Sequence, residues 1–192
     1  EVSLAGVERP TTTSPVAYGH RGLPVEEGFP FTGMELKRVP VDNAPSFDDG
    51  PPGNLFLYVE HDDDSRRHLV FVDTPDVDSV ERRHRTVAEA LYLLSHVVIF
   101  VTSQEKYADH IPSSLLQRMH REGKPFYVLF NKADDGQAKD ELPAVFRGRG
   151  VPIRDNHFFT IPFISNAARS GEILKAGLQR CIDAVLEEYP PS

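Results

Sequence analysis

The sequence has 192 residues, a formal net charge of −8 and one cysteine. This length suits one ordinary domain with a hydrophobic core, and 40% hydrophobic with 26% charged residues is typical of a soluble globular chain. The acidic balance disfavours direct binding to nucleic acid or to an anionic membrane surface, and a lone cysteine excludes an intramolecular disulfide. Residues 1–4 lack a signal-peptide pattern and no apolar run reaches membrane-spanning length, so we expect a cytoplasmic protein.

The composition changes near residue 54. Residues 1–54 are rich in Pro, Gly and Thr, whereas short β-rich runs alternate with helical patterns from residue 55 onward. We therefore predict a single domain over residues 1–192, in which an N-terminal segment with an insertion precedes an α/β core at residues 55–188.

The predicted elements of this core follow in chain order. Two strand-like runs, 55–60 and 68–73, flank an aspartate-rich turn and are expected to pair as an antiparallel hairpin. Next come a helix at 79–94, a buried strand at 96–101, a helix at 106–121 that ends at Gly123, a strand at 126–130, a helix at 137–146, a strand at 157–164 and a helix at 170–188. This alternation predicts parallel strands joined by helical crossovers, with helices on both faces of the sheet.

Polar residues follow three of the predicted strands. They are Asp73-Thr74-Pro75-Asp76, Asn131-Lys132-Ala133-Asp134 and Ser165-Asn166-Ala167. Ligands of such sheets bind at the carboxyl ends of the strands, so we expect the three segments at one edge. An aspartate at this place suits Mg²⁺, which prefers hard oxygen ligands. The Asp134 carboxylate can accept both the N1 and N2 hydrogens of guanine, a donor pair that adenine lacks.

At these residues the chain resembles the P-loop GTPases, and within them the Era-like and dynamin-like branches. Asn131, Lys132 and Asp134 resemble the NKxD motif that recognises guanine. Asp73 opens a segment similar to the DxxG motif of switch II. Ser165, Asn166 and Ala167 are similar to the motif that lies behind the base.

The run at residues 9–13 resembles switch I, whose threonine binds magnesium and approaches the γ-phosphate. By position this role falls to Thr12, with Thr11 and Thr13 as alternatives. The resemblance implies a three-layer P-loop NTPase-like fold, GTP or GDP and Mg²⁺ as ligands, and hydrolysis of GTP with Asp73 and Thr12 as the catalytic and metal-binding residues.

Three features depart from the family pattern: the missing phosphate loop, Asp76, and the insertion at residues 22–53. No Gly-x-x-x-x-Gly-Lys-Ser/Thr phosphate loop occurs, because the one Gly-Lys pair, Gly123-Lys124, precedes a proline. Too few residues precede Thr12 to hold the first strand and that loop, so we expect both to be missing from this sequence, either encoded upstream or lost. Asp76 stands in place of the DxxG glycine and brings a like charge toward the γ-phosphate.

These departures leave a second function open, a pseudo-GTPase that serves as an interaction platform without hydrolysis. Local structural roles are also open: Asp73 can cap a loop, and Asn131 and Asp134 favour turns. The insertion at residues 22–53 is either a partner-binding loop or padding. A protein partner or a further domain of the same chain is expected beside the guanine nucleotide, and Cys181 is expected to be an inert core residue.

Overall fold

The computed structural model describes residues 14–44, 54–74, 82–103, 110–133, 137–162 and 167–190. The chain divides into two compact units, one that ends at Leu94 and one that begins at Ser95. The compositional change near residue 54 lies inside the first unit, because β2 (Glu35–Pro40) pairs with β3 (Leu55–His61) across it. The organisation as one domain stays a prediction.

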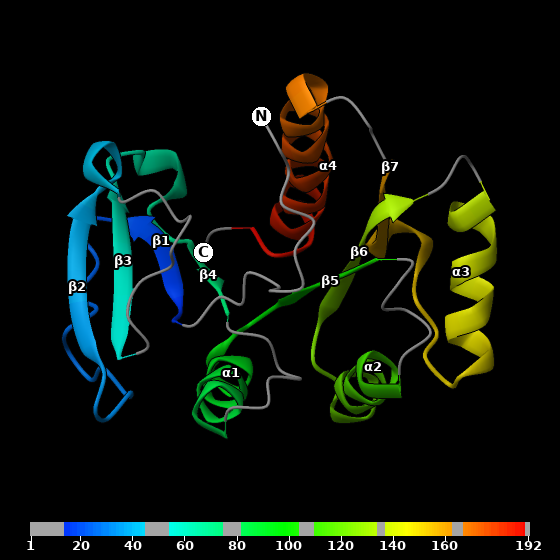
Figure 1. Cartoon of the computed structure of the whole chain (residues 1–192), viewed down its shortest axis with the longest axis horizontal. Helices are drawn as coiled ribbons and strands as arrows, with labels where there is room; N and C mark the ends of the chain where they lie inside the picture. The colour runs from blue at the N-terminus through cyan, green and yellow to red at the C-terminus, as the bar shows by residue number, and fades with distance from the viewer. Residues whose placement is uncertain are drawn as a thin grey trace. The chain divides into compact units, whose positions relative to one another are not determined.

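The first unit contains a mixed sheet with the strand order β2-β3-β1-β4 (Figure 1). β1 (Val16–His20) runs parallel to β3 and antiparallel to β4 (Val70–Asp73). The predicted hairpin of residues 55–60 and 68–73 is therefore wrong, since β1 lies between these two strands. The connection at residues 62–69, which includes the 3-10 turn η2 (Asp64–Arg66), is long enough to cross an intervening strand, a distance of about 10 Å.

The core of this unit lies between the sheet, helix α1 (Arg82–Leu94) and the loop that joins β1 to β2. Its buried residues are Ala17, Phe56, Tyr58, Val87 and Leu91. Val87 and Leu91 are one helical turn apart and share one face of α1. The rings of Phe29 and Phe31 pack on Phe56 with centroids 5.2 and 5.3 Å away. This part of the predicted insertion is thus a cover for the core. A short 3-10 turn, η1 (Val41–Asn43), follows β2.

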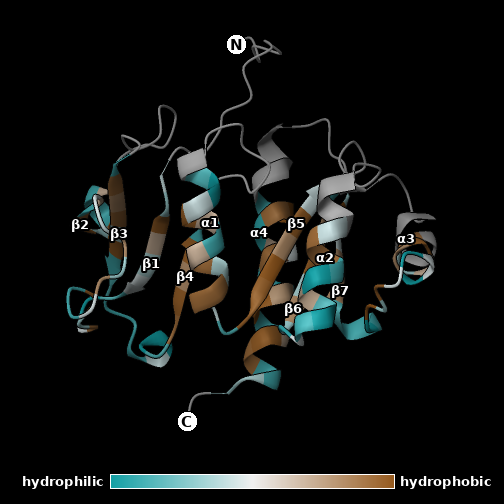
Figure 2. Ribbon diagram, turned by 90° about the horizontal axis from the view of Figure 1, so that it is seen from below, coloured by the Kyte–Doolittle hydropathy of each residue, from teal (hydrophilic) through white to brown (hydrophobic). Residues whose placement is uncertain are grey.

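The second unit contains a parallel sheet with the order β5-β6-β7, formed by β5 (Val98–Ser103), β6 (Phe126–Ala133) and β7 (Phe158–Pro162). The helices α2 (His110–Glu122), α3 (Gln137–Gly148) and α4 (Ala167–Glu188) alternate with these strands, and the turn η3 (Asp155–His157) precedes β7. Helices α2 and α4 lie on opposite faces of the sheet (Figures 1 and 2). The α/β prediction with helices on both faces of a parallel sheet is confirmed for this unit.

Alternating side chains of β6 build the core on both faces of the second sheet. Tyr127 and Leu129 join Ile161 and Cys181 in one buried cluster under α4, whereas Val128 and Phe130 point to the other face. Figure 2 shows the corresponding hydrophobic colour along β5 and β6. Cys181 is fully buried, as predicted.

Several local predictions are also confirmed or corrected. Gly123 ends α2 with φ +67°, a left-handed conformation that favours glycine, as predicted. Helix α4 begins at Ala167, three residues earlier than expected.

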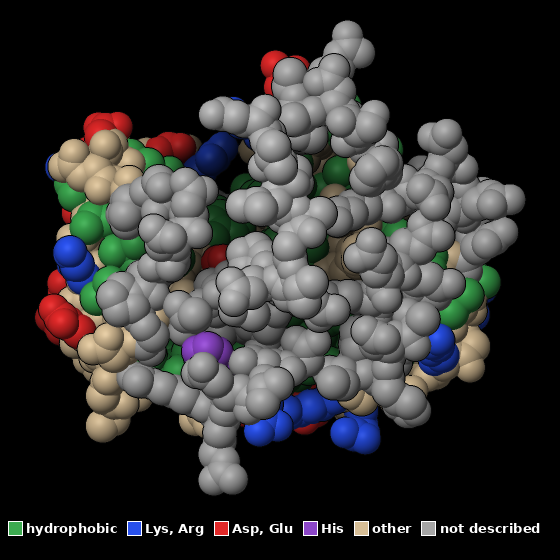
Figure 3. Space-filling view, in the orientation of Figure 1, with side chains coloured by type: hydrophobic (Ala, Val, Ile, Leu, Met, Phe, Trp, Pro, Cys, Tyr) green, Lys and Arg blue, Asp and Glu red, His purple; other side chains and the backbone are tan. Residues whose placement is uncertain are grey.

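No helix in the described part of the chain is both long and apolar enough to cross a membrane. On the described surface of the first unit, acidic and basic side chains are interspersed on the face shown in Figure 3.

Candidate functional site

The carboxyl end of β4 carries Asp73, the first of the predicted site residues. Asp73 is exposed, and its backbone is paired with Val16, the first residue of β1. The carbonyl oxygen of Pro15 accepts a hydrogen bond of 3.2 Å from the backbone N–H of Leu57, which fixes the chain just before β1. Thr12 lies outside the described residues, four positions before Val16 in the sequence. The register of β1 against β4 thus brings the chain that follows residues 11–13 to the end of the sheet where Asp73 lies.

The carboxyl ends of β5, β6 and β7 lie at one edge of the second sheet. Ser103 is paired with Asn131, and Ala133 with Pro162. Asn131 is half-buried at this edge. The carboxyl edge of a parallel sheet is the usual place for a ligand, and Asn131 lies at that edge.

The remaining predicted residues are only partly described. Lys132 belongs to β6, and Ala167 is the first residue of α4. Asp134, Ser165 and Asn166 lie outside the described residues. The stretch from Pro162 at the end of β7 to the start of α4 contains the last two, so this stretch begins at the same edge as Asn131.

The structure does not place all three strand ends in one hydrogen-bonded sheet. Asp73 ends β4, which pairs with β1 in the first unit, whereas Asn131 lies on β6, which pairs with β5 and β7 in the second. The expected single edge is therefore replaced by two edges in two sheets. β4 is the edge strand of the first sheet, and its partner there is β1, for which the sequence pattern gave no signal.

Two hydroxyl residues at the end of β5 were missed from the sequence. Ser103 is the direct neighbour of Asn131 in the sheet. Thr102 is 4% exposed, and its Oγ1 has no hydrogen-bond partner among the described residues. A buried polar group without a partner costs about 1–3 kcal/mol. The signal in the sequence was a pair of hydroxyl residues directly after the apolar run of β5.

The one Gly-Lys pair of the sequence has a structural role at the other end of β6. Gly123 ends α2, and Lys124 Nζ donates a hydrogen bond of 2.7 Å to the carbonyl oxygen of Ser95. The pair is a helix-ending turn two residues before β6 begins, at the opposite end of the strand from Asn131. It does not form a loop that could surround phosphates beside the predicted base site.

Two of the described residues, Asp73 and Asn131, carry polar groups of the kind that a magnesium–nucleotide site uses. No group of three or more His, Cys, Asp or Glu side chains that could hold a metal ion occurs in the described ranges. Asp73 carries an exposed carboxylate, and Mg²⁺ keeps several waters and commonly takes one or two carboxylates. Asn131 offers an amide donor and acceptor at the edge where a base would lie.

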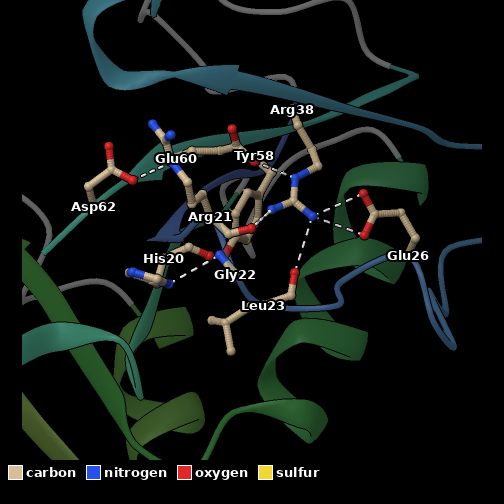
Figure 4. A network of polar contacts seen from close by, with 9 residues as sticks. All are labelled: His20, Arg21, Gly22, Leu23, Glu26, Arg38, Tyr58, Glu60 and Asp62. Atoms are coloured by element: carbon tan, nitrogen blue, oxygen red, sulfur yellow. Dashed lines mark hydrogen bonds and ion pairs between the residues drawn. The ribbon is translucent and has the colours of Figure 1, made fainter. Parts of the chain in front are cut away.

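A second polar network in the first unit is built around Arg38 (Figure 4). The guanidinium donates to Glu60 Oε1 at 2.5 Å, to Glu26 at 3.0 Å and to the carbonyl oxygens of Leu23 and Arg21. Desolvation lowers the pKa of Arg38, but the hydrogen bonds to the two carboxylates outweigh it and raise the pKa. The hydrogen bond from Arg38 in turn lowers the pKa of Glu26.

This Arg38 network lies at the end of β1 that is remote from Asp73. Tyr58 donates a hydrogen bond of 3.1 Å to the carbonyl oxygen of His20, the last residue of β1. The Arg38 guanidinium lies 5.1 Å from the centroid of the Tyr58 ring. Burial raises the pKa of the Tyr58 hydroxyl, so it remains a donor. The network holds the loop after β1 on the sheet and thereby fixes the position of β1.

The comparisons with known proteins gave no match. No family model matches the sequence, and no curated protein or solved structure matches the chain. Functional conclusions therefore depend on the residues and geometry described above.

Proposed function

We propose that the chain is the guanine-nucleotide-binding part of a GTPase that hydrolyses GTP to GDP and phosphate as a molecular switch. The observation that carries this proposal is the position of the sequence Asn131-Lys132-Ala133-Asp134, which begins at the carboxyl end of β6, the central strand of a parallel sheet. The carboxyl edge of such a sheet is the usual place for a ligand. The motif and the strand end therefore coincide.

Each predicted residue has a distinct role in this proposal. Asp134 would accept the N1 and N2 hydrogens of guanine, the stem of Lys132 would cover the base, and Asn131 would tie the neighbouring loops together. Ser165, Asn166 and Ala167 would lie behind the base. Asn131 on β6 and Ala167 at the start of α4 support this arrangement, since both belong to the second unit.

Asp73 and Thr12 would hold the metal in the same proposal. The pairing of Val16 with Asp73 supports it, because it leaves only a short stretch of chain between Thr12 and the end of β4. Bound GTP with Mg²⁺ supplies the phosphoanhydride to be cleaved and the positive charge that neutralises it. The residues of the chain orient these groups, so we expect slow turnover unless a partner assists.

A nucleotide titration tests the proposal. The full-length gene product is titrated with GTP, GDP and ATP in the presence of Mg²⁺, with displacement of a fluorescent guanine nucleotide as the readout. We expect GTP and GDP to bind at least about tenfold more tightly than ATP, a difference of about 1.4 kcal/mol. Equal affinity for GTP and ATP would contradict the role of Asp134.

The competing function is a pseudo-GTPase platform, which a specific observation favours. The sequence contains no phosphate loop, and its Gly123-Lys124 pair is occupied in the turn after α2. In that case the folded full-length protein does not hydrolyse GTP at a measurable rate. Binding without measurable hydrolysis would support the platform as the function of the nucleotide-bound protein.

A further inference from the structure

The last residue of α4 gathers three hydrogen-bond donors at the edge of the second sheet opposite to Asn131. Glu188 Oε2 accepts from the Tyr127 hydroxyl at 2.8 Å and lies 2.7 Å from His157 Nε2. Glu188 Oε1 accepts from the Arg154 guanidinium at 3.2 Å. The hydrogen bonds from Tyr127 and then from His157 lower the pKa of Glu188, so this carboxylate is ionised at neutral pH.

His157 is held between two acceptors. The residue is 8% exposed, and Nδ1 lies 3.1 Å from the carbonyl oxygen of Phe126 while Nε2 faces the Glu188 carboxylate. Neither a carbonyl nor an ionised carboxylate has a hydrogen to donate, so both ring nitrogens must donate. Only the protonated imidazolium can do this. The neutral ring leaves one nitrogen lone pair pointed at an oxygen, whichever tautomer it adopts.

Aromatic, charged and titratable groups surround His157. The Tyr127 ring stacks on it with centroids 4.2 Å apart, and burial followed by the Glu188 carboxylate raises the pKa of the Tyr127 hydroxyl. The other charged or titratable neighbours, which line the same cavity of about 420 Å³ as His157 and Glu188, are His120, Lys124, Arg154 and Tyr189. Among these residue types, histidine alone ordinarily changes charge between about pH 5 and pH 8, and His120 is exposed on α2.

We propose that His157, Glu188 and Tyr127 form a proton-operated clasp that fastens the last turn of α4 to the start of β6 and to η3. The protonated ring joins Glu188 to the Phe126 carbonyl, and loss of the proton breaks one of these two bonds. The clasp is therefore closed while the His157 ring is protonated, and it weakens when the ring loses a proton as the pH rises. This inference does not depend on the nucleotide proposal.

The opening of the clasp can be measured through the reactivity of a cysteine on α4. Cys181, the only cysteine in the sequence, lies about two turns before Glu188 on α4. Its thiol is fully buried against Tyr127, Leu129 and Ile161, and burial raises its pKa to about 11. A reagent reaches this thiol only when α4 moves away from the sheet. The labelling rate of Cys181 thus measures the detachment of α4.

The test follows the labelling of Cys181 by a thiol reagent from pH 5.5 to pH 8.5. Each rate is divided by the rate in denaturant at the same pH, which removes the intrinsic effect of thiolate formation. We expect the protection of Cys181 in the native chain to fall by about tenfold over this range, the effect of one lost charge-assisted hydrogen bond. Protection that stays constant with pH would overturn the proposal.

Three variants make the test specific. Glu188→Gln offers either a donor or an acceptor to His157, and His157→Gln removes the titrating ring, so both should give protection that does not vary with pH. Arg154→Gln is the matched control, because it removes an exposed donor to Glu188 but keeps the histidine, and it should retain the pH dependence. The same pH dependence in Glu188→Gln and the native chain would overturn the proposal.

A direct measurement decides the question even where a variant fails to fold. In ¹⁵N-histidine spectra of the native chain, we expect both ring nitrogens of His157 to carry a proton at pH 5.5 and one of them to lose it by pH 8.5. The same protonation state at both pH values would contradict the clasp.

Discussion

The contact of α4 with β7 gives a sharp prediction for Gly177→Ala. A Cβ atom at Gly177 would lie 2.5 Å from Cγ1 and 3.0 Å from Cδ1 of Ile161, inside a packed core. Overpacking of this kind costs about 1–3 kcal/mol. Alanine in a helix interior returns about 1 kcal/mol through its higher helix propensity. The net expected loss in the free energy of unfolding is therefore about 0–2 kcal/mol.

A matched control separates these two effects. At Gly148, the last residue of α3, an added Cβ would meet no atom within 4 Å, and φ lies outside the left-handed region. Gly148→Ala makes the same chemical change without the contact, so it should be neutral or stabilising by up to about 1 kcal/mol. We expect Gly177→Ala to be less stable than Gly148→Ala by about 1–3 kcal/mol in urea unfolding followed by circular dichroism. Equal stability of the two variants would refute the close approach of α4 to Ile161.

Three further changes test other parts of the structure by the midpoint of urea unfolding. Gly19→Ala should lower the midpoint, because the added Cβ would lie 2.9 Å from Cζ of Tyr58; an unchanged midpoint would contradict the packing of that ring on β1. Arg38→Met should cost about 1–3 kcal/mol by leaving the part-buried Glu60 carboxylate without its donor, whereas the exposed Arg21→Met should cost less than about 1 kcal/mol; equal costs would show that the network contributes no more than a surface ion pair. The lowered pKa of Glu188 means that its stabilising contribution is present above the unfolded-state pKa and is lost as the pH falls through the folded-state pKa. The native chain should therefore lose more stability than Glu188→Gln during acidification from about pH 5.5 to pH 3, and parallel stability curves would contradict this.

Local patterns in the sequence were sufficient for most of the second unit. The run from Phe126 to Phe130 is apolar throughout, as a strand buried on both faces requires, and it forms the first part of β6. Gly123 marked the end of α2 because only a left-handed residue closes the helix there. In this unit each strand is joined to its sequential neighbour by a helix, so chain order and spatial order agree.

The first unit could not be predicted in the same way. β1 is five residues long and contains Gly19, which weakens a strand signal, and its two partners β3 and β4 come much later in the chain. Strand pairing of this kind depends on contacts between distant segments. The assumption that neighbouring strands in sequence also pair therefore produced a hairpin that the structure does not contain.

In the candidate site, too, local sequence patterns predicted some residues, whereas others depend on contacts between distant segments. Asn131 and Asp73 were found because polar residues directly after an apolar run are visible in the sequence, and both lie at strand ends. The hydroxyl of Thr102, which has no hydrogen-bond partner among the described residues, was missed because only packing shows that it is buried. The pair of His157 with Glu188 joins residues that are 31 positions apart, so no local pattern could indicate it.

The most direct measurement for the proposed function is a change of base specificity at Asp134. In the full-length gene product, Asp134→Asn should weaken GDP binding and strengthen binding of the xanthine nucleotide, because the amide can donate to the added carbonyl of xanthine but cannot accept the two guanine hydrogens. Asp155→Asn, at an exposed position in η3, is the matched control and should leave both affinities unchanged. A preference for GDP over the xanthine nucleotide that is the same in Asp134→Asn and in the native protein would contradict guanine recognition by this segment.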